Sequence, residues 1–506
     1  MSDWIVAKRP AGEAMVGVIG AGVMGAGIAQ VAAQAGHEVR LLDAREGAAE
    51  AAIAQIAKSL DGLVAKGRME GGQREALLAR IQPASAVAEL ADVALVVEVI
   101  VEKLEPKQAL LRELDALLPA GAIIASNTSS ISITALANGM RNPQRLVGMH
   151  FFNPVPLMKL VEVVSGAETA PEVAAAIFEL AARWGKTPVH AKSTPGFIVN
   201  RIARPYYAET LALLLEQAGQ PAQLDRALRG VGFRMGPCEL MDLIGHDTNF
   251  LVTQSVFEAN FGDKRYMPSL VQKALVDGGR LGRKVGKGFY EGLPAAAAPV
   301  AAPAAAPRHL VLVGAGPLVE GLGRWLSHKG LSFTRETHSD WDGLRVGDVG
   351  LQLHLSTGIS AAQLAFTRCH DALAVIDWPL APDKIDALAY AAAPKLAGGQ
   401  RALVEDLLRA LGWEPLALRD VPGLVVARTI AMLVNEGADA VWQGVCDEAG
   451  ADTAMKLGVN YPAGPFEWLA QLGSGPVVQL LDGLFEAYRS ERYRVSPLLQ
   501  RLRWGA

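Results

Sequence analysis

A glycine-rich turn between two apolar strands limits the fold of this chain more than any other feature of its sequence. Residues 15–43, MVGVIGAGVMGAGIAQVAAQAGHEVRLLD, run from a short apolar strand through glycines into an Ala-rich helix, then into a second strand that ends at Asp43. The alternation continues with a buried strand at 91–100, a helix at 104–118 and a strand at 121–130. Strands that alternate with helices in this way predict a parallel, doubly wound α/β sheet.

The rest of the chain predicts a helical domain and then a second copy of both domains. From about residue 194 the apolar spacing becomes helical, and residues 293–307 are nearly all Ala and Pro, which is typical of a semi-rigid spacer. Beyond it, HLVLVGAGPLVEGLGRWLSHKG repeats the strand, turn and helix, and VPGLVVAR at 421–428 matches TPGFIVNR at 194–201. The expected domains are 1–192 (Rossmann type), 193–292 (helical), 293–308 (linker), 309–415 (degenerate Rossmann-like) and 416–506 (second helical).

Composition narrows the class of protein. The chain has 506 residues, a formal net charge of −4 and no long basic run, which argues against nucleic acid as its main partner. We expect no membrane span and no signal peptide, because the apolar stretches are soon interrupted by charge, Gly or Pro. The three cysteines, Cys238, Cys369 and Cys446, lie far apart, so we expect neither disulfides nor a metal site, and a cytoplasmic location.

The turn itself predicts a dinucleotide site. Gly20, Gly22 and Gly25 form GxGxxG between a strand and a helix, which allows a tight turn and a close approach of pyrophosphate to the helix N-terminus. Alone, this motif is equally compatible with a plain turn. Asp43, 23 residues after the first glycine, ends the second strand where an acid binds ribose hydroxyls, which favours NAD. Arg45 keeps a phosphorylated ribose open as an alternative.

The second copy of the turn departs from this pattern. It keeps Gly314 and Gly316, but Pro317 enters the turn and Val319 stands where the third glycine is required. We find no acid at the matching strand end. The sequence therefore predicts no second nucleotide site.

Polar residues cluster between the predicted sheet and the helical domain. His150 is the one histidine in the apolar run GMHFFNPVPLMKLVEVV, and Glu162 follows on a segment that can lie alongside it. A base held by a carboxylate is one interpretation, and a buried core histidine beside an exposed glutamate is the other. Asn127 and Ser129 in SNTSS can be helix caps, and Asn200 can bind nearby backbone. The residues alone leave these alternatives open.

Five strings, taken together and in order, carry a family resemblance. They are GAGVMGAGIA, SNTSSISIT, HFFNPVPLMKLVEVV, TPGFIVNR and GRKVGKGFY, and they resemble those of the 3-hydroxyacyl-CoA dehydrogenases over residues 15–291. A weaker match to the tandem-repeat members continues past the spacer. By length and duplicated layout the chain is most similar to the 3-hydroxyadipyl-CoA dehydrogenases of phenylacetate breakdown, with the 3-hydroxybutyryl-CoA dehydrogenases of fatty-acid or butanoate metabolism a close second.

The resemblance implies a role for each matching residue. His150 matches the general base, Glu162 its carboxylate partner, and Ser129 and Asn200 the residues that bind the reacting oxygen. Residues that match nucleotide contacts, beyond the glycines and Asp43, are Glu102, Lys107, Asn127, Asn153 and Lys284. Ser59 and Lys66, with Ser129, match contacts of the thioester substrate. In the second copy Ala427 stands at the position of Asn200, and we find no counterpart of SNTSS or HFFNP, so one active site is expected per chain.

The implied reaction is the reversible, NAD-dependent oxidation of an (S)-3-hydroxyacyl-CoA to a 3-oxoacyl-CoA. Arg201 and Arg204 are the candidates for binding a carboxylate at the far end of an adipyl chain. A sugar-acid dehydrogenase and a non-enzymatic nucleotide-binding protein are the rival interpretations. Helical domains of this family pair between subunits, so we expect the two helical domains to pack on each other within one chain, and formation of homo-oligomers stays open.

Overall fold

The computed structural model describes residues 14–294, 299–302 and 309–505, and most of the linker expected at 293–308 lies outside these residues. The chain forms two compact units. The first contains the described residues up to Val199 together with 444–459. The second contains residues 200–443 and 460–505.

The first unit is built on an eight-stranded sheet in the order β3-β2-β1-β4-β5-β6-β7-β8. Its first six positions follow the doubly wound order, and all pairs among them are parallel. Strand β7 runs antiparallel to β6 and parallel to β8. The strands are β1 (Val16–Ile19), β2 (Val39–Leu42), β3 (Ile81–Ala84), β4 (Leu95–Glu98), β5 (Ile123–Ser126), β6 (Leu146–Phe151), β7 (Leu160–Ser165) and β8 (Thr187–Lys192).

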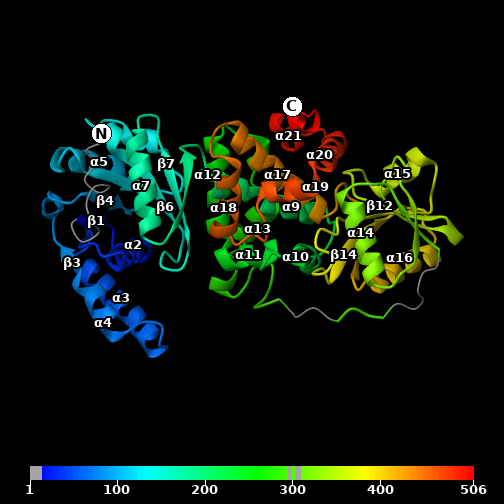
Figure 1. The fold of residues 1–506 in the computed structure, drawn as a ribbon, viewed down its shortest axis with the longest axis horizontal. Coiled ribbons are helices and arrows are strands. Elements are labelled where there is room, and N and C mark those ends of the chain that lie inside the picture. The colour runs from blue at the N-terminus through cyan, green and yellow to red at the C-terminus, as the bar shows by residue number, and fades with distance from the viewer. Residues whose placement is uncertain (1–13, 295–298, 303–308, 506) are drawn as a thin grey trace. The chain divides into compact units, whose positions relative to one another are not determined.

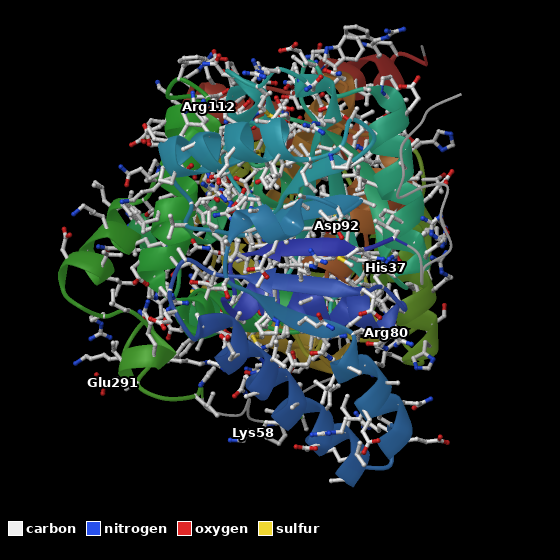
Figure 2. All side chains as sticks on the ribbon, turned by 90° about the vertical axis from the view of Figure 1, so that its left-hand side faces the viewer. His37, Lys58, Arg80, Asp92, Arg112 and Glu291 are labelled. Atoms are coloured by element: carbon white, nitrogen blue, oxygen red, sulfur yellow. The ribbon has the colours of Figure 1, made fainter. Side chains whose placement is uncertain are left out.

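Helices cover this sheet, and their apolar sides form one buried core with the strands. They are α2 (Val23–Gln34), α3 (Ala48–Ala65), α4 (Gly71–Ala79), α5 (Leu104–Leu117), α6 (Ile133–Ala137), α7 (Pro171–Arg183) and α18 (Glu448–Gly458), with short 3-10 turns at Val87–Leu90 and Pro143–Arg145. Helices α3 and α4 form a hairpin that projects beyond the sheet (Figure 1). Lys58 points outward from α3 and is exposed (Figure 2).

Helix α18 comes from the far end of the chain but belongs to the first unit, where it packs on β7 and β8. A side chain at Gly458, its last residue, would place a Cβ 2.8 Å from Leu160 and 2.9 Å from Val199. The close approach of helix to strand therefore requires glycine at this position. The sequence had placed residues 444–459 in the second helical domain, because nothing in their pattern reveals which sheet they cover.

The second unit contains a seven-stranded sheet in the order β10-β9-β11-β12-β13-β14-β15. Strand β11 lies between β9 and β12 and is antiparallel to both. In the first sheet the strands at this place, β1 and β4, are direct neighbours and parallel. The strands are β9 (Leu310–Val313), β10 (Phe333–Glu336), β11 (Gly343–Val346), β12 (Leu351–Leu355), β13 (Leu373–Ile376), β14 (Ala387–Ala392) and β15 (Glu414–Ala417). This partial copy confirms the predicted fold class: a Rossmann-type domain, a helical domain, and a degenerate repeat of both.

The helices of the second unit fall into those beside its sheet and those of the two helical copies. Beside the sheet lie α14 (Pro317–His328), α15 (Ala361–Arg368) and α16 (Gly398–Ala410). The first helical copy contains α8 (Val199–Ile202), α9 (Arg204–Leu215), α10 (Pro221–Gly230), α11 (Pro237–Ile244), α12 (His246–Ala259) and α13 (Leu270–Asp277), with 3-10 turns at Lys264–Tyr266 and Arg283–Val285. The second contains α17 (Val426–Trp442), α19 (Pro465–Leu472), α20 (Ser474–Tyr488) and α21 (Pro497–Arg503), with a 3-10 turn at Glu491–Tyr493.

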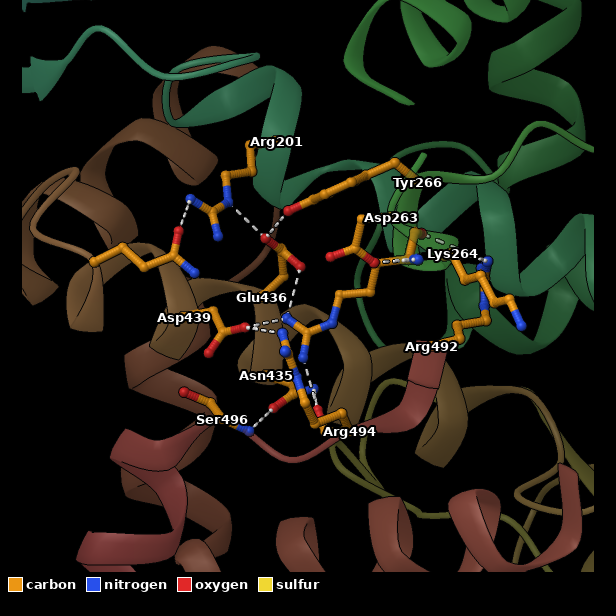
Figure 3. A network of polar contacts seen from close by, with 12 residues as sticks. Arg201, Asp263, Lys264, Tyr266, Asn435, Glu436, Asp439, Arg492, Arg494 and Ser496 are labelled. Carbon is orange, nitrogen blue, oxygen red and sulfur yellow. Dashed lines mark hydrogen bonds and ion pairs between the residues drawn. The ribbon is translucent and has the colours of Figure 1, made fainter. Parts of the chain in front are cut away.

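Two buried carboxylates hold the helical copies together. Glu436 of the second copy binds Arg201, Arg265 and Tyr266 of the first (Figure 3). In return, Glu209 of the first copy binds Arg428, Arg492 and Tyr493 of the second. Matching residues of the two networks lie the same 227 positions apart, as from 201 to 428. The two helical copies therefore pack within one chain, each with its buried glutamate paired to the other copy.

In the part of the chain that the structure describes, no helix is long and apolar enough to cross a membrane.

Candidate active site

His150 and Glu162 lie directly opposite each other on the antiparallel strands β6 and β7. The His150 Nδ1 and a Glu162 carboxylate oxygen are 2.5 Å apart, and both residues are buried, with exposed fractions of 5% and 0%. The rings of Phe152 and Phe197 lie 4.6 and 5.8 Å from the imidazole ring. A histidine oriented through one nitrogen by a buried carboxylate has the arrangement that a general base requires.

The second oxygen of Glu162 fixes the start of helix α8. It accepts the backbone N–H groups of Ile198 and Val199 at 3.0 and 2.9 Å. These donors follow a tight turn in which Gly196 and Phe197 have φ values of 78° and 47°. One carboxylate therefore orients the base and caps the segment that leads into Asn200, the next residue of the chain.

Ser129 lies in a loop that Glu102 anchors. A Glu102 oxygen accepts the Thr128 hydroxyl at 2.7 Å and the Ser129 N–H at 2.9 Å. Burial raises the pKa of Glu102, but the Thr128 hydroxyl, the Lys107 cation and the Ser129 N–H together bring the pKa below its usual value. Glu102 is therefore a carboxylate that positions the loop.

Lys107 has a different environment from the nucleotide contact that the resemblance implies. It is 1% exposed, and its Nζ lies 2.6 Å from Glu98 and 3.3 Å from Glu102. Glu98, which the sequence analysis did not single out, also accepts the Ser126 hydroxyl at 2.6 Å. Its only sequence signal is an acid at the end of an apolar strand. Through these buried contacts, Lys107 and Glu98 hold Glu102 and the start of the Ser129 loop in place.

The other predicted residues lie in several places. Asn127 accepts the Phe151 N–H at 2.8 Å and so ties β5 to the strand of His150, whereas Asn153 is exposed just beyond that strand. Ser59 and Lys66 are exposed along and at the end of α3. In the second unit, the Lys284 Nζ donates to both carboxylate oxygens of Asp247 at 2.6 Å.

The glycine turn fits a dinucleotide. A Cβ at Gly25 would lie 1.7 Å from the Gly20 carbonyl, so the helix and the strand meet there with no space for a side chain. A Cβ at Gly22 would meet nothing within 4 Å, so the space before helix α2 is open. This helix has no side-chain cap and no acid in its first turn, which suits the approach of a pyrophosphate anion.

Asp43 joins this turn to the end of β2. Its carboxylate accepts the Ala21 N–H at 2.7 Å and the Arg45 N–H at 3.0 Å. Burial raises the pKa of Asp43, but these donors and the Arg45 guanidinium bring the pKa below its usual value. The group is therefore charged at neutral pH, which suits a ribose with free hydroxyls and disfavours a ribose phosphate.

We expect Asp43→Ala to weaken NAD binding by about 10-fold to 100-fold, the loss of a charge-assisted hydrogen bond to ribose. Titration of the protein with NADH, followed by fluorescence, measures this change. Asp92→Ala is the matched control, because Asp92 is an exposed acid of the same unit that pairs with Arg40. Equal NADH affinity in wild type and Asp43→Ala would contradict a role at the ribose.

The second copy has lost the matching side chains. Strand registers place Asp377 at the position of His150, and Ala389 at that of Glu162. Asp377 accepts the backbone N–H groups of Val425, Val426 and Ala427, so its carboxylate caps the second helix start as Glu162 caps the first. A carboxylate bound in this way replaces the base and its partner.

The structure corrects the statement that the second copy has no counterpart of SNTSS. The string LSTG begins at Leu355, the last residue of β12, and leads to Ser360, which caps α15 as Ser132 caps α6. Thr357 stands at the position of Ser129. The sequence comparison missed this loop because only the cap and the strand register identify it.

The turn of the second copy is also closed differently. Gly314 donates its N–H to Glu336 as Gly20 does to Leu42, so Thr337 takes the place of Asp43. Asp342, from the loop before the inserted β11, accepts the Ala315 N–H instead at 3.2 Å. In the described residues of this copy, the acid at the turn therefore comes from the loop before β11 and not from the end of the second strand, where Asp43 stands in the first copy.

Family models match most of the described chain, with residues 309–352 outside the matches. The NAD-binding domain of 3-hydroxyacyl-CoA dehydrogenase matches residues 15–194, and the C-terminal domain of the same family matches 196–292 and 423–504. The reduced Rossmann-fold domain of 3-hydroxybutyryl-CoA dehydrogenase matches 353–422. The fold and these matches define an NAD-dependent oxidoreductase, as the sequence predicted.

Similarity to individual proteins extends over the full length. A 3-hydroxyadipyl-CoA dehydrogenase of Escherichia coli (strain K12) is 43% identical over 96% of both chains. A crystal structure of 3-hydroxybutyryl-CoA dehydrogenase from Escherichia coli K12 has 42% identity and a TM-score of 0.88, and covers 97% of this chain and 98% of that chain. A probable 3-hydroxybutyryl-CoA dehydrogenase of Deinococcus radiodurans is 43% identical over 54% of this chain and 99% of its own length. The chain belongs to the 3-hydroxyacyl-CoA dehydrogenase family, and its reaction class is the NAD-dependent oxidation of a 3-hydroxyacyl-CoA.

Proposed function

We propose that the chain oxidises 3-hydroxyadipyl-CoA, a step of aromatic (phenylacetate) catabolism, with His150 as general base. The observation that carries the assignment of the base is the buried contact of 2.5 Å between His150 and Glu162. The full-length similarity to a 3-hydroxyadipyl-CoA dehydrogenase supports the substrate. The alternative substrate is 3-hydroxybutyryl-CoA, which a full-length structural relative is named for.

In this proposal His150 removes the proton of the 3-hydroxyl through Nε2, while Glu162 holds the ring through Nδ1 and stabilises its protonated form. Ser129 and Asn200 donate hydrogen bonds to the oxygen as charge develops on it. NAD, when bound, accepts the hydride from the carbon. Gly20, Gly22 and Gly25 would hold the pyrophosphate of the nucleotide, and Asp43 would bind its ribose hydroxyls.

The remaining contacts divide into direct and indirect ones. Asn153 and Lys284 bind nucleotide directly, whereas Glu102, Lys107 and Asn127 act by positioning the Ser129 loop and the end of β6. Ser59 and Lys66 bind CoA from the exposed face of α3. The three free cysteines, Cys238, Cys369 and Cys446, support a reducing, cytoplasmic compartment.

The domain division 1–192, 193–292, 293–308, 309–415 and 416–506 is part of this proposal. The family matches at 15–194, 196–292 and 353–422 support its first, second and fourth parts. The helical match at 423–504 supports the last part, although residues 444–459 pack in the first compact unit.

Steady-state assays of NADH absorbance with 3-hydroxyadipyl-CoA and 3-hydroxybutyryl-CoA test the substrate. We expect kcat/KM to be at least about 10-fold higher for the adipyl substrate, because a site that binds a second carboxylate gains a charge-assisted contact. A preference for 3-hydroxybutyryl-CoA would select the alternative. If neither thioester leads to formation of NADH, both proposed substrates are rejected.

A further inference from the structure

Two arginines at the start of the first helical copy differ in their partners. Arg201 and Arg204 are both 5% exposed. The Arg201 Nε lies 2.6 Å from Glu436, and another guanidinium nitrogen lies 3.0 Å from the amide oxygen of Gln443 (Figure 3). Burial lowers the pKa of Arg201, but Glu436 outweighs this effect and raises it above its usual value. The charge of Arg201 is neutralised inside the protein.

Arg204 has no such partner. Its Nε donates to the Asn200 carbonyl at 2.9 Å, one terminal nitrogen donates to the Thr253 hydroxyl at 3.1 Å, and the guanidinium lies 4.9 Å from the centre of the Tyr207 ring. No carboxylate of residues 14–294, 299–302 or 309–505 forms an ion pair with it. Burial lowers the pKa of Arg204, and Tyr207 offsets only part of this effect. Burial of a cation without an anion is unfavourable, so Arg204 lowers the free energy of unfolding.

The second helical copy provides an internal control. Arg428 matches Arg201 and binds Glu209 at 2.8 Å, so this arginine is kept in a copy without the base or its partner. Ala431 stands at the position of Arg204. The paired arginine belongs to the architecture of both copies, whereas the unpaired one is present only in the copy that follows His150.

We propose that Arg204 binds the terminal carboxylate of a dicarboxylic 3-hydroxyacyl-CoA and so selects this substrate over a monocarboxylic one. The proposal rests on the proposed function, in which Asn200 contacts the 3-hydroxyl oxygen. Arg204 is four residues further on, and its Nε donates to the Asn200 carbonyl at 2.9 Å, so the guanidinium lies beside the backbone of the residue that contacts the 3-hydroxyl oxygen. In an adipyl chain only three C–C bonds of about 1.5 Å separate C3 from the terminal carboxyl carbon, so residues as near to each other as Asn200 and Arg204 are needed to bind both ends of this segment.

The test compares 3-hydroxyadipyl-CoA with 3-hydroxyhexanoyl-CoA, which has the same chain length but no terminal carboxylate. In the full-length wild type we expect kcat/KM to favour the adipyl substrate by about 100-fold, because without the carboxylate the buried guanidinium stays unpaired. In Arg204→Met we expect this preference to fall to about threefold or less, mainly through a loss on the adipyl substrate. Arg204→Lys keeps the charge but not the planar fork, and is expected to restore part of the preference.

Arg201→Met is the matched control. It leaves Glu436 with one arginine fewer, so we expect a lower unfolding midpoint and an unchanged preference between the two substrates. A wild type with no preference, or an Arg204→Met variant that keeps the wild-type preference or loses activity equally on both substrates, overturns the assignment of Arg204. If Arg204→Met does not fold, the wild-type preference and the Arg204→Lys ratio decide. Failure of the wild type to oxidise either thioester rejects the proposed function itself.

Discussion

A His150→Gln variant is expected to lose turnover by at least about 100-fold, with NADH affinity unchanged within about twofold. Glutamine can still donate a hydrogen bond to Glu162, but it cannot accept the proton of the 3-hydroxyl. The nucleotide turn and Asp43 lie on other strands and are untouched. Turnover is measured under saturating NAD and thioester, and NADH affinity by fluorescence titration.

The control for this variant is its unfolding midpoint, which we expect to match that of the wild type because the residue stays buried and bonded to Glu162. Turnover within about threefold of the wild-type value would remove His150 from the mechanism.

Asp377→Ala is expected to have the opposite effect, a loss of about 3 kcal/mol or more in unfolding free energy at pH 8 with turnover per folded molecule retained. The carboxylate accepts buried N–H groups of Trp378, Val425, Val426 and Ala427, all of which the substitution leaves without this acceptor. Urea unfolding followed by circular dichroism measures the loss.

The pH dependence of this loss follows from the buried position of Asp377. Burial raises the pKa of Asp377 to about 6, above its usual value of 3.8. Between about pH 4 and pH 6 the folded chain therefore holds a proton that the unfolded chain releases, so the wild type gains stability relative to the variant as the pH falls through this window. Asp386→Ala, which removes an exposed acid of the same unit, is the control, and an equal effect of both substitutions would refute the capping role.

Local patterns were sufficient to predict much of the fold and of the site. The glycine spacing and Asp43 predicted the first turn because each of those positions is set by close backbone contacts that only certain residues allow. The alternation of apolar segments predicted the sheet, and the duplicated strings predicted the second copy. The sequence alone could not decide whether His150 pairs with Glu162 or is a core histidine beside an exposed glutamate. The strand register places the two side chains together.

Features that depend on distant partners could not be predicted. The sequence analysis names Arg201 and Arg204 together as candidates, because Glu436, which neutralises Arg201, lies more than two hundred residues away. The motif around Lys107 predicts a nucleotide contact, and in the structure its ammonium group forms ion pairs with Glu98 and Glu102. The antiparallel insertion of β11 likewise follows from pairing between strands, not from the pattern of either strand.

The exchange of buried glutamates between the helical copies constrains how this chain can evolve. A deletion of the second half would leave Glu209 without Arg428 and Arg492, and would expose the surface of α9 that α17 covers. Substitutions at Arg428 and Arg492 of the second half are therefore constrained, although Asp377 replaces the histidine there. A substitution of Arg428 or Arg492 in the second half would thus destabilise the first half, because Glu209 has its buried contacts with both.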